Sequence, residues 1–105
     1  MEPFNRVYIV NTGGHDVSGA AKYGQFVYLT EHRVNIFATD RLQVELADKL
    51  ANFNSEKDYV LLCGAIVINV IVMEILRVFC DNINILLYDF RSSTYVVRKL
   101  CRTSL

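Results

Sequence analysis

The sequence predicts a small α/β domain, and three observations support this. Short apolar segments rich in Val, Ile and Tyr are typical of strands buried in a sheet. They alternate with longer segments in which apolar residues recur at helical spacing. Glycine or clusters of polar residues separate most of these segments. This alternation predicts βαβ units, right-handed crossovers and a mainly parallel sheet.

The first strand is expected at residues 6–11, which are apolar on both faces, as in a central strand. A short helix should follow, with Asp16 or Ser18 as its cap. It should end at Tyr23 and Gly24, because glycine readily adopts the positive φ that often follows a helix. The chain thus begins with a strand, a glycine turn and a helix start.

Residues 26–30 form the second expected strand. Residues 34–37 are a further apolar run, so the two could form a hairpin. Asp40 is the predicted N-cap of the helix that follows. Beyond it, apolar residues recur at the spacing of an amphipathic helix. These apolar positions are Leu42, Leu46, Leu50 and Phe53.

Residues 54–58 read as a loop and residues 59–63 as a fully buried strand. Residues 65–79 should form a helix that is apolar on nearly every face and must be covered on more than one side. Residues 83–88 are the last core strand, and residues 94–99 return as an edge strand. The expected fold is therefore a three-layer, Rossmann-like or flavodoxin-like domain with a C-terminal β-hairpin.

Length and charge limit the function classes. The chain has 105 residues and a hydrophobic content of 52%, which fits one domain spanning residues 1–105. Eleven basic and eleven acidic residues cancel, so little global charge is available for binding duplex nucleic acid. Cys63, Cys80 and Cys101 lack the spacing of a zinc site, which favours three reduced thiols.

The segment of residues 59–79 is almost as long as a membrane-spanning helix. It contains Glu74 and Arg77, however, and each charge would cost about 2.5 to 3.5 kcal/mol in hydrocarbon. Gly64 also divides it into a strand-sized and a helix-sized piece. The first ten residues lack the pattern of a signal peptide. We therefore expect a cytoplasmic protein with no membrane partner.

A ligand site is expected at the carboxyl ends of the parallel strands, where helix N-termini present unpaired N–H groups. The Gly13-Gly14 turn would let backbone N–H groups approach an anion, and Gly64 would allow a tight turn from strand to helix. Neither a G-x-G-x-x-G fingerprint nor a P-loop is present. The predicted ligand-binding residues are Asn11, Thr12, Gly13, Gly14, Ser18, Gly64 and Asn69.

Three residues are candidates for catalysis. His15 would act as an acid or base, because imidazole exchanges protons near neutral pH, and Asp16 or Asp89 would orient it. Alternatively, Asp16 merely caps the following helix and His15 is an exposed loop residue. These three side chains are too few for an ordinary metal site, so no metal is expected. The side chain of Asn69 also has two possible roles: it contacts a ligand, or it forms a hydrogen bond with a neighbouring backbone group.

Several segments carry a resemblance to a known class of proteins. They are the loop of residues 13–16, the strand of residues 58–64, the end of the last core strand at residues 86–91, and residues 95–98. In these segments the chain resembles small α/β proteins encoded by phages and other mobile elements. The resemblance implies a compact protein that acts in nucleotide metabolism, signalling or assembly.

Two functions from different classes follow. The first is binding of a nucleotide or a similar phosphorylated small molecule at the carboxyl edge of the sheet. The second is a non-enzymatic assembly or interaction protein, in which a second copy of the chain completes the apolar helix of residues 65–79 in a homo-oligomer. Whether a reaction is catalysed stays open, because one base without a nucleophile or metal is an incomplete apparatus. The sequence does not indicate a cofactor.

Overall fold

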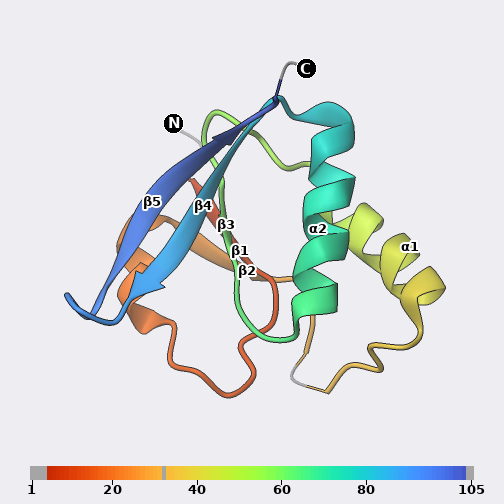
Figure 1. The fold of residues 1–105 in the computed structure, drawn as a ribbon, viewed down its shortest axis with the longest axis horizontal. Coiled ribbons are helices and arrows are strands. Elements are labelled where there is room, and N and C mark those ends of the chain that lie inside the picture. Colours follow the sequence, from red (N-terminus) through yellow and green to blue (C-terminus); the bar gives the residue numbers. More distant parts are fainter. Residues whose placement is uncertain (1–4, 32, 104–105) are drawn as a thin grey trace.

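The computed structural model describes residues 5–31 and 33–103, which form a mixed α/β fold (Figure 1). Parallel strands alternate with helices until the chain ends in a hairpin. In chain order the elements are β1 (Arg6–Ile9), the 3-10 helix η1 (Ser18–Tyr23), β2 (Gln25–Tyr28), α1 (Thr39–Leu50), β3 (Tyr59–Leu61), α2 (Ile66–Phe79), β4 (Asn82–Asp89) and β5 (Thr94–Cys101).

The five strands form one sheet in the order β2-β1-β3-β4-β5. The first four strands run parallel, and β5 pairs with β4 in the antiparallel direction. The predicted α/β class, the mainly parallel sheet and the C-terminal hairpin are therefore confirmed. β1 lies between β2 and β3, which explains why its residues are apolar on both faces.

Helices α1 and α2 cover one face of the sheet and η1 covers part of the other (Figure 1). On the first face, Val72 and Leu76 of α2 belong to the same buried cluster as Ile83 and Ile85 of β4. On the second face, Ala20 of η1 joins a smaller buried cluster. Alternate residues of β1 to β4 belong to the two clusters, as the period of a strand requires, whereas β5 contributes only to the smaller cluster, through Tyr95 and Val97.

The amphipathic helix predicted after residue 38 is confirmed, since Leu42, Leu46 and Leu50 are buried along one side of α1. Its predicted N-cap was wrong. The residue preceding the helix is Ala38, and Asp40 lies in the first turn. The side chain of Asp40 can therefore favour the helix through the charge at its N-terminus rather than as a cap.

The strand predicted at residues 34–37 does not form. These residues make a turn, in which the backbone N–H of Phe37 donates to Oδ1 of Asn35 at 3.1 Å. Ile36 and Phe37 face solvent, and Phe37 is 87% exposed. A hairpin with β2 was expected, but the chain leaves β2 for the crossover that leads through α1 to β3, so the short apolar run has no neighbouring strand to pair with.

Other predicted boundaries move by a few residues. β1 and β3 end at Ile9 and Leu61, two residues earlier than expected. β4 and β5 are each eight residues long and extend beyond the predicted strands. In the described ranges, no helix is long and apolar enough to span a membrane.

Candidate functional site

The carboxyl edge of the sheet carries a pocket of about 440 Å³. It lies between the loop that enters η1, the end of β3 and the turn of the β4–β5 hairpin. Its floor belongs to the face that η1 covers, because Val17, Leu61 and Tyr95 are members of that buried cluster. The lining residues are His15, Asp16, Val17, Leu61, Leu62, Cys63, Gly64, Tyr88, Phe90 and Tyr95.

Two glycine-containing turns come close together beside this pocket. A Cβ on Gly64 would lie 2.6 Å from the carbonyl oxygen of Asn11, and the φ of Gly64 is +78°. Both facts exclude a larger residue there, as the predicted tight turn requires. A Cβ on Gly13 would lie 3.9 Å from the Cα of Gly64. The Gly13-Gly14 turn and the β3–α2 turn therefore adjoin, although Gly13 and Gly64 are 51 positions apart in the sequence.

Asn11 is buried, and its carboxamide holds the two loops that follow β1 and β2. Its Nδ2 donates to Oγ1 of Thr30 and to the carbonyl oxygen of Glu31, both at 2.8 Å. The Thr30 hydroxyl in turn donates to the carbonyl oxygen of Val10 at 2.6 Å. Both amide protons of Asn11 thus stabilise the carboxyl edge of the sheet, which leaves only its Oδ1 for a ligand.

Asn69 was predicted either to contact a ligand or to bond neighbouring backbone, and the structure shows the backbone hydrogen bonds. Its side chain bonds the backbone of the β3–α2 turn: Nδ2 donates to the carbonyl oxygens of Cys63 and Ala65, and Oδ1 accepts the N–H of Cys63. The amide also lines a shallow groove along α2. Its hydrogen bonds nevertheless hold the backbone on both sides of Gly64. Asn69 therefore fixes the β3–α2 turn at the edge of the pocket.

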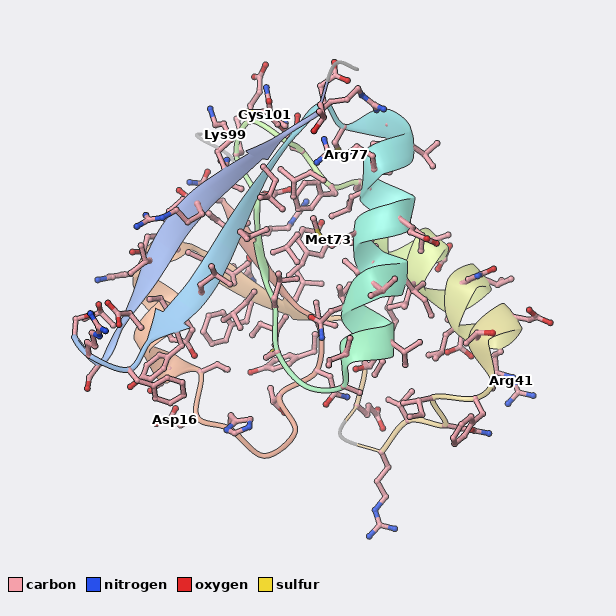
Figure 2. The ribbon with its side chains drawn as sticks, in the orientation of Figure 1. Asp16, Arg41, Met73, Arg77, Lys99 and Cys101 are labelled. Atoms are coloured by element: carbon pink, nitrogen blue, oxygen red, sulfur yellow. The ribbon has the colours of Figure 1, made fainter. Side chains whose placement is uncertain are left out.

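The loop that enters η1 holds His15 and Asp16, both exposed. The backbone N–H of His15 donates to the carbonyl oxygen of Thr12 at 2.8 Å, closing the glycine turn. Oδ1 of Asp16 accepts the N–H of Ser18, the first residue of η1, at 2.9 Å. This backbone hydrogen bond lowers the pKa of the Asp16 carboxyl below its ordinary value. Asp16 therefore supports the start of η1, as predicted, and lines the pocket as an anion (Figure 2).

Asp89 lies apart from the other two candidate catalytic residues and does not line the pocket. Its carboxylate organises the hairpin turn: Oδ1 accepts the N–H of Arg91 at 2.9 Å, and Oδ2 accepts the hydroxyl of Ser92 at 3.1 Å. Tyr88 and Phe90, its neighbours in the chain, line the pocket instead. The alternation of side chains along β4 separates Asp89 from its neighbours.

Sequence reasoning missed the aromatic side of the pocket. The rings of Tyr88 and Phe90 meet edge to face with their centroids 5.0 Å apart, and Tyr88 lies 5.2 Å from Tyr95. Phe90 is 86% exposed, although Tyr95 is buried. The signal that could have found this group is the aromatic spacing Tyr88, Phe90 and Tyr95 around a predicted turn at the expected ligand edge.

Burial changes the protonation of two further lining residues. It raises the pKa of the Cys63 thiol, although the backbone N–H of Asn11 partly offsets this effect. It also raises the pKa of the Tyr95 hydroxyl. Both groups are therefore neutral at physiological pH, and Cys63 lacks the thiolate character of a nucleophile.

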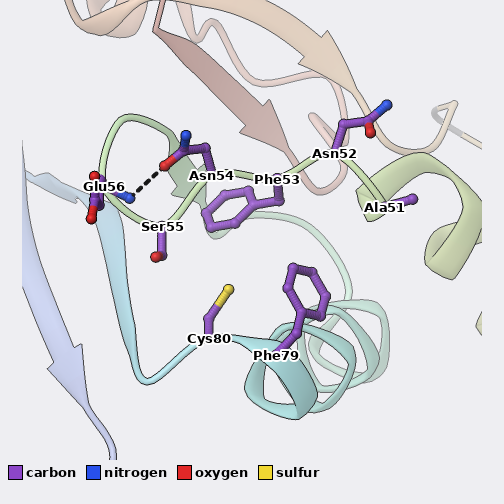
Figure 3. Close-up of a pocket in the computed structure, with 8 residues that line it drawn as sticks. All are labelled: Ala51, Asn52, Phe53, Asn54, Ser55, Glu56, Phe79 and Cys80. Carbon is purple, nitrogen blue, oxygen red and sulfur yellow. Dashed lines mark hydrogen bonds between the residues drawn. The ribbon is translucent and has the colours of Figure 1, made fainter.

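A second hollow lies at the amino edge of the sheet and has a volume of about 510 Å³ (Figure 3). Phe53, Phe79 and Cys80 form its apolar part, and Oδ1 of Asn54 accepts the N–H of Glu56 at its rim. It includes none of the predicted site residues. Within residues 5–31 and 33–103, no group of three His, Cys, Asp or Glu side chains could hold a metal ion.

Comparison with protein families gives one result. Residues 5–100 match the model of a family described as Phage Pam3 gp32-like protein. The matched range includes the pocket and all five strands almost completely, and it confirms the predicted resemblance to small phage-encoded proteins. No curated protein and no solved structure is significantly similar to the chain.

Proposed function

The chain belongs to the family of phage Pam3 gp32-like proteins, and we propose that it binds a nucleotide or a similar phosphorylated small molecule in the carboxyl-edge pocket. The observation that carries this proposal is the place of the pocket in the sheet. The order β2-β1-β3-β4-β5 is that of flavodoxin-like sheets, apart from the direction of β5. In such sheets, ligands bind beyond the carboxyl ends of the strands, near the point where the order reverses.

The aromatic side of the pocket suits a flat ring. Tyr88 and Phe90 offer ring surfaces, and the exposure of Phe90 leaves a face free for stacking. Stacking of a base on an aromatic side chain contributes about 1 to 3 kcal/mol. Asp16, an anion, would accept hydrogen bonds from an amino group or a ribose hydroxyl.

The glycine turns suit a phosphate group. Backbone N–H groups of Gly13 and Gly14 can approach an anion because no Cβ blocks them. Helix α2 begins immediately after Gly64 and Ala65, so its first N–H groups add partial positive charge at the same edge. Asp16 would repel the phosphate from the start of η1, and the phosphate would then lie near the Gly13-Gly14 turn and the β3–α2 turn. Thr12 and Ser18 would supply hydroxyl groups.

Any reaction at the phosphate would use His15 as acid or base, with Asp16, which also lines the pocket, orienting it. Replacement of His15 by Ala should then lower turnover by about a hundredfold or more without changing the fold. An unchanged rate would leave the protein as a binding domain.

Thermal-shift measurements with mono-, di- and cyclic nucleotides test the binding proposal. A ligand at a hundred times its Kd should add about 2.7 kcal/mol to the free energy of unfolding. Phe90→Ala should weaken binding, whereas Phe37→Ala removes an equally exposed ring outside the pocket and should not. Flat melting curves across the whole panel would refute the proposal for these ligands.

The second candidate function is a non-enzymatic interaction or assembly protein of the phage. The observation that favours it is the exposure of apolar side chains on α2, where Ile66 is 81% and Val78 is 82% exposed. A protein of this kind would show no nucleotide-dependent stabilisation and would bind through α2. The two candidate functions therefore involve different surfaces: a nucleotide would bind in the carboxyl-edge pocket, and a partner protein would bind the exposed side of α2.

A further inference from the structure

The face of the sheet that carries α1 and α2 is only partly covered (Figure 1). On this face, Ile83 and Ile85 of β4 are buried beneath the helices. The next residue of the same parity, Leu87, is 41% exposed. Because β4 leads into a hairpin and not into a helix, the described part of the chain contains no helix that follows β4 and could cover the remaining surface.

The register of the hairpin identifies the residues on this uncovered surface. Leu100 pairs with Ile83, Arg98 with Ile85 and Val96 with Leu87, and directly paired residues share a face. Leu100 is 39% exposed, as expected at a position that no helix covers. We call the surface made by these residues of the hairpin the open hairpin face: Leu87, Val96, Arg98 and Leu100.

Helix α2 borders the open hairpin face. Met73 and Arg77 lie on the side of α2 that is turned toward β4 and β5 (Figure 2). A groove of about 660 Å³ runs along this helix, and its lining is mainly apolar: it includes Ile66, Val70 and Met73. The lining also contains Glu74 and Arg77, and it contains no residue of β4 or β5. The exposed side of α2 and the open hairpin face are therefore two neighbouring areas on the same face of the sheet, and we call them together the contact surface.

The two areas of this surface carry charges of opposite sign: Glu74 on the outward side of α2 and Arg98 on the open hairpin face. Glu74 is the only acidic residue of α2, and it lies on the outward side beside Val70 and Val78. Of the four residues of the open hairpin face, Arg98 is the charged one, and within the described residues it forms no ion pair. Asp89 follows Leu87 on the same side of β4, but its carboxylate accepts the N–H of Arg91 and the hydroxyl of Ser92 in the hairpin turn. The Arg98 guanidinium bonds only its neighbour's carbonyl oxygen, that of Val97. A carboxylate from another molecule could therefore bind the Arg98 guanidinium without first displacing a carboxylate of the same chain.

We propose that a second copy of this chain occupies this surface in a two-fold symmetric dimer. The α2 helix of each copy lies over the open hairpin face of the other, in the place where a doubly wound sheet would carry its next helix. Val70 and Val78 then pack on Leu87 and Leu100 of the partner copy. The two-fold axis makes every contact occur twice, so each Glu74 meets an Arg98.

A second copy explains this surface better than an unrelated protein, because the chain itself supplies both halves of the contact. The outward side of α2 provides the apolar ridge and the carboxylate, and the open hairpin face provides the apolar floor and the cation. Contact between complementary surfaces of one chain about a two-fold axis closes and does not propagate into a fibre. The groove along α2 and the ligand pocket share Leu62, Cys63 and Gly64 at the β3–α2 turn. The four valine and leucine residues proposed to meet in the dimer, and Glu74 and Arg98, do not line the ligand pocket, so the two proposals can be tested separately.

Sedimentation equilibrium and light scattering of the full chain test this proposal. The wild-type protein should show twice the chain mass of 12.0 kDa at micromolar concentrations. Val70→Glu should give a monomer, because it places a charge in the apolar contact. Val44→Glu is the matched control: Val44 is 72% exposed on α1, outside the surface, and its replacement should leave the dimer intact. Circular dichroism checks that both variants fold.

Charge exchange tests the pairing itself. Glu74→Arg and Arg98→Glu should each weaken the dimer by bringing like charges together, and the double variant should restore the wild-type dissociation constant to within a few fold. A wild-type monomer at all concentrations would overturn the proposal and leave the surface to a different protein. Equal masses for the Val70 and Val44 variants, or no restoration in the double variant, would also overturn it.

Discussion

The carboxamide of Asn69 bonds both backbone polar groups of Cys63, six residues earlier: its Oδ1 accepts the Cys63 N–H at 3.1 Å, and its Nδ2 donates to the Cys63 carbonyl oxygen at 3.0 Å. The same Nδ2 also donates to the carbonyl oxygen of Ala65. One side chain of α2 thereby replaces the backbone partners that β3 loses where it leaves the sheet. The position of Gly64 depends on this arrangement.

Replacement of Asn69 by Ala should therefore lower the free energy of unfolding by about 1 to 3 kcal/mol, since partly buried backbone groups lose their partners. Urea denaturation measures the change. Asn52→Ala is the control, because Asn52 is exposed and outside the turn. Equal stability of the two variants would show that water replaces the carboxamide without loss.

Glycine replacements separate backbone strain from steric collision. Gly14→Ala and Gly64→Ala both force a non-glycine residue into positive φ, at a cost of about 1 to 3 kcal/mol. At Gly64 the new Cβ also collides with the backbone of Asn11, whereas at Gly14 it meets no atom within 4 Å. Thermal or urea unfolding should show the larger loss for Gly64→Ala. The reverse order would contradict the close approach of the two turns.

Asp58 is a buried carboxylate at the amino edge of the sheet. Its Oδ1 accepts the N–H of Arg6 at 3.0 Å, and its Oδ2 accepts the N–H of Asn54 at 2.8 Å. Asp58→Ala should lower the free energy of unfolding by about 2 kcal/mol or more, because both N–H groups lose a charged acceptor. Asp48→Ala, on the exposed side of α1, should change it by less than about 0.5 kcal/mol. A similar effect of both replacements would contradict the role of Asp58.

Stability should fall at alkaline pH. Burial raises the pKa of Cys63 and Cys80 above 9.0, and that of Tyr8 and Tyr95 above 10.0. The folded protein therefore keeps protons that the unfolded chain releases above these values. This contribution is fully present below pH 9 and is lost as the pH rises through the folded-state values. Urea midpoints measured on both sides of pH 9 should decrease, and less so for Cys63→Ala; midpoints that rise with pH would contradict the predicted sign.

Local patterns predicted most of the fold. The spacing of Leu42, Leu46 and Leu50 indicated α1, and the apolar run before Gly64 indicated a buried strand that turns into a helix. The glycines of residues 13–14 and 64 also indicated two turns at one edge of a parallel sheet. These features were predictable because each depends on residues that are close together in the sequence.

Features that depend on distant residues were not predictable. The run of residues 34–37 has the composition of a strand, but the crossover to β3 leaves it without a partner. Asn11 was predicted as a ligand contact, and the hydrogen bonds of both its amide protons to the loop after β2 were not predicted. The aromatic wall of the pocket depends on the exact register between β4 and β5, which pairs Tyr88 with Tyr95. No local pattern specifies such a pairing.

The hairpin also divides the sheet into a local and a non-local part, with a consequence for folding. β4 and β5 pair along eight residues each across a short turn, whereas β1 must pair with β3, more than 40 residues away. Isolated hairpins form in about 1 to 10 μs, and long-range parallel pairing is slower because loop closure opposes it. Pulsed hydrogen exchange should therefore protect the amides of β4 before those of β1; simultaneous protection would indicate a single concerted step. The C-terminal strands would then be the surface on which the N-terminal strands assemble, so a chain emerging from the ribosome could complete its sheet only after its last strand is synthesised.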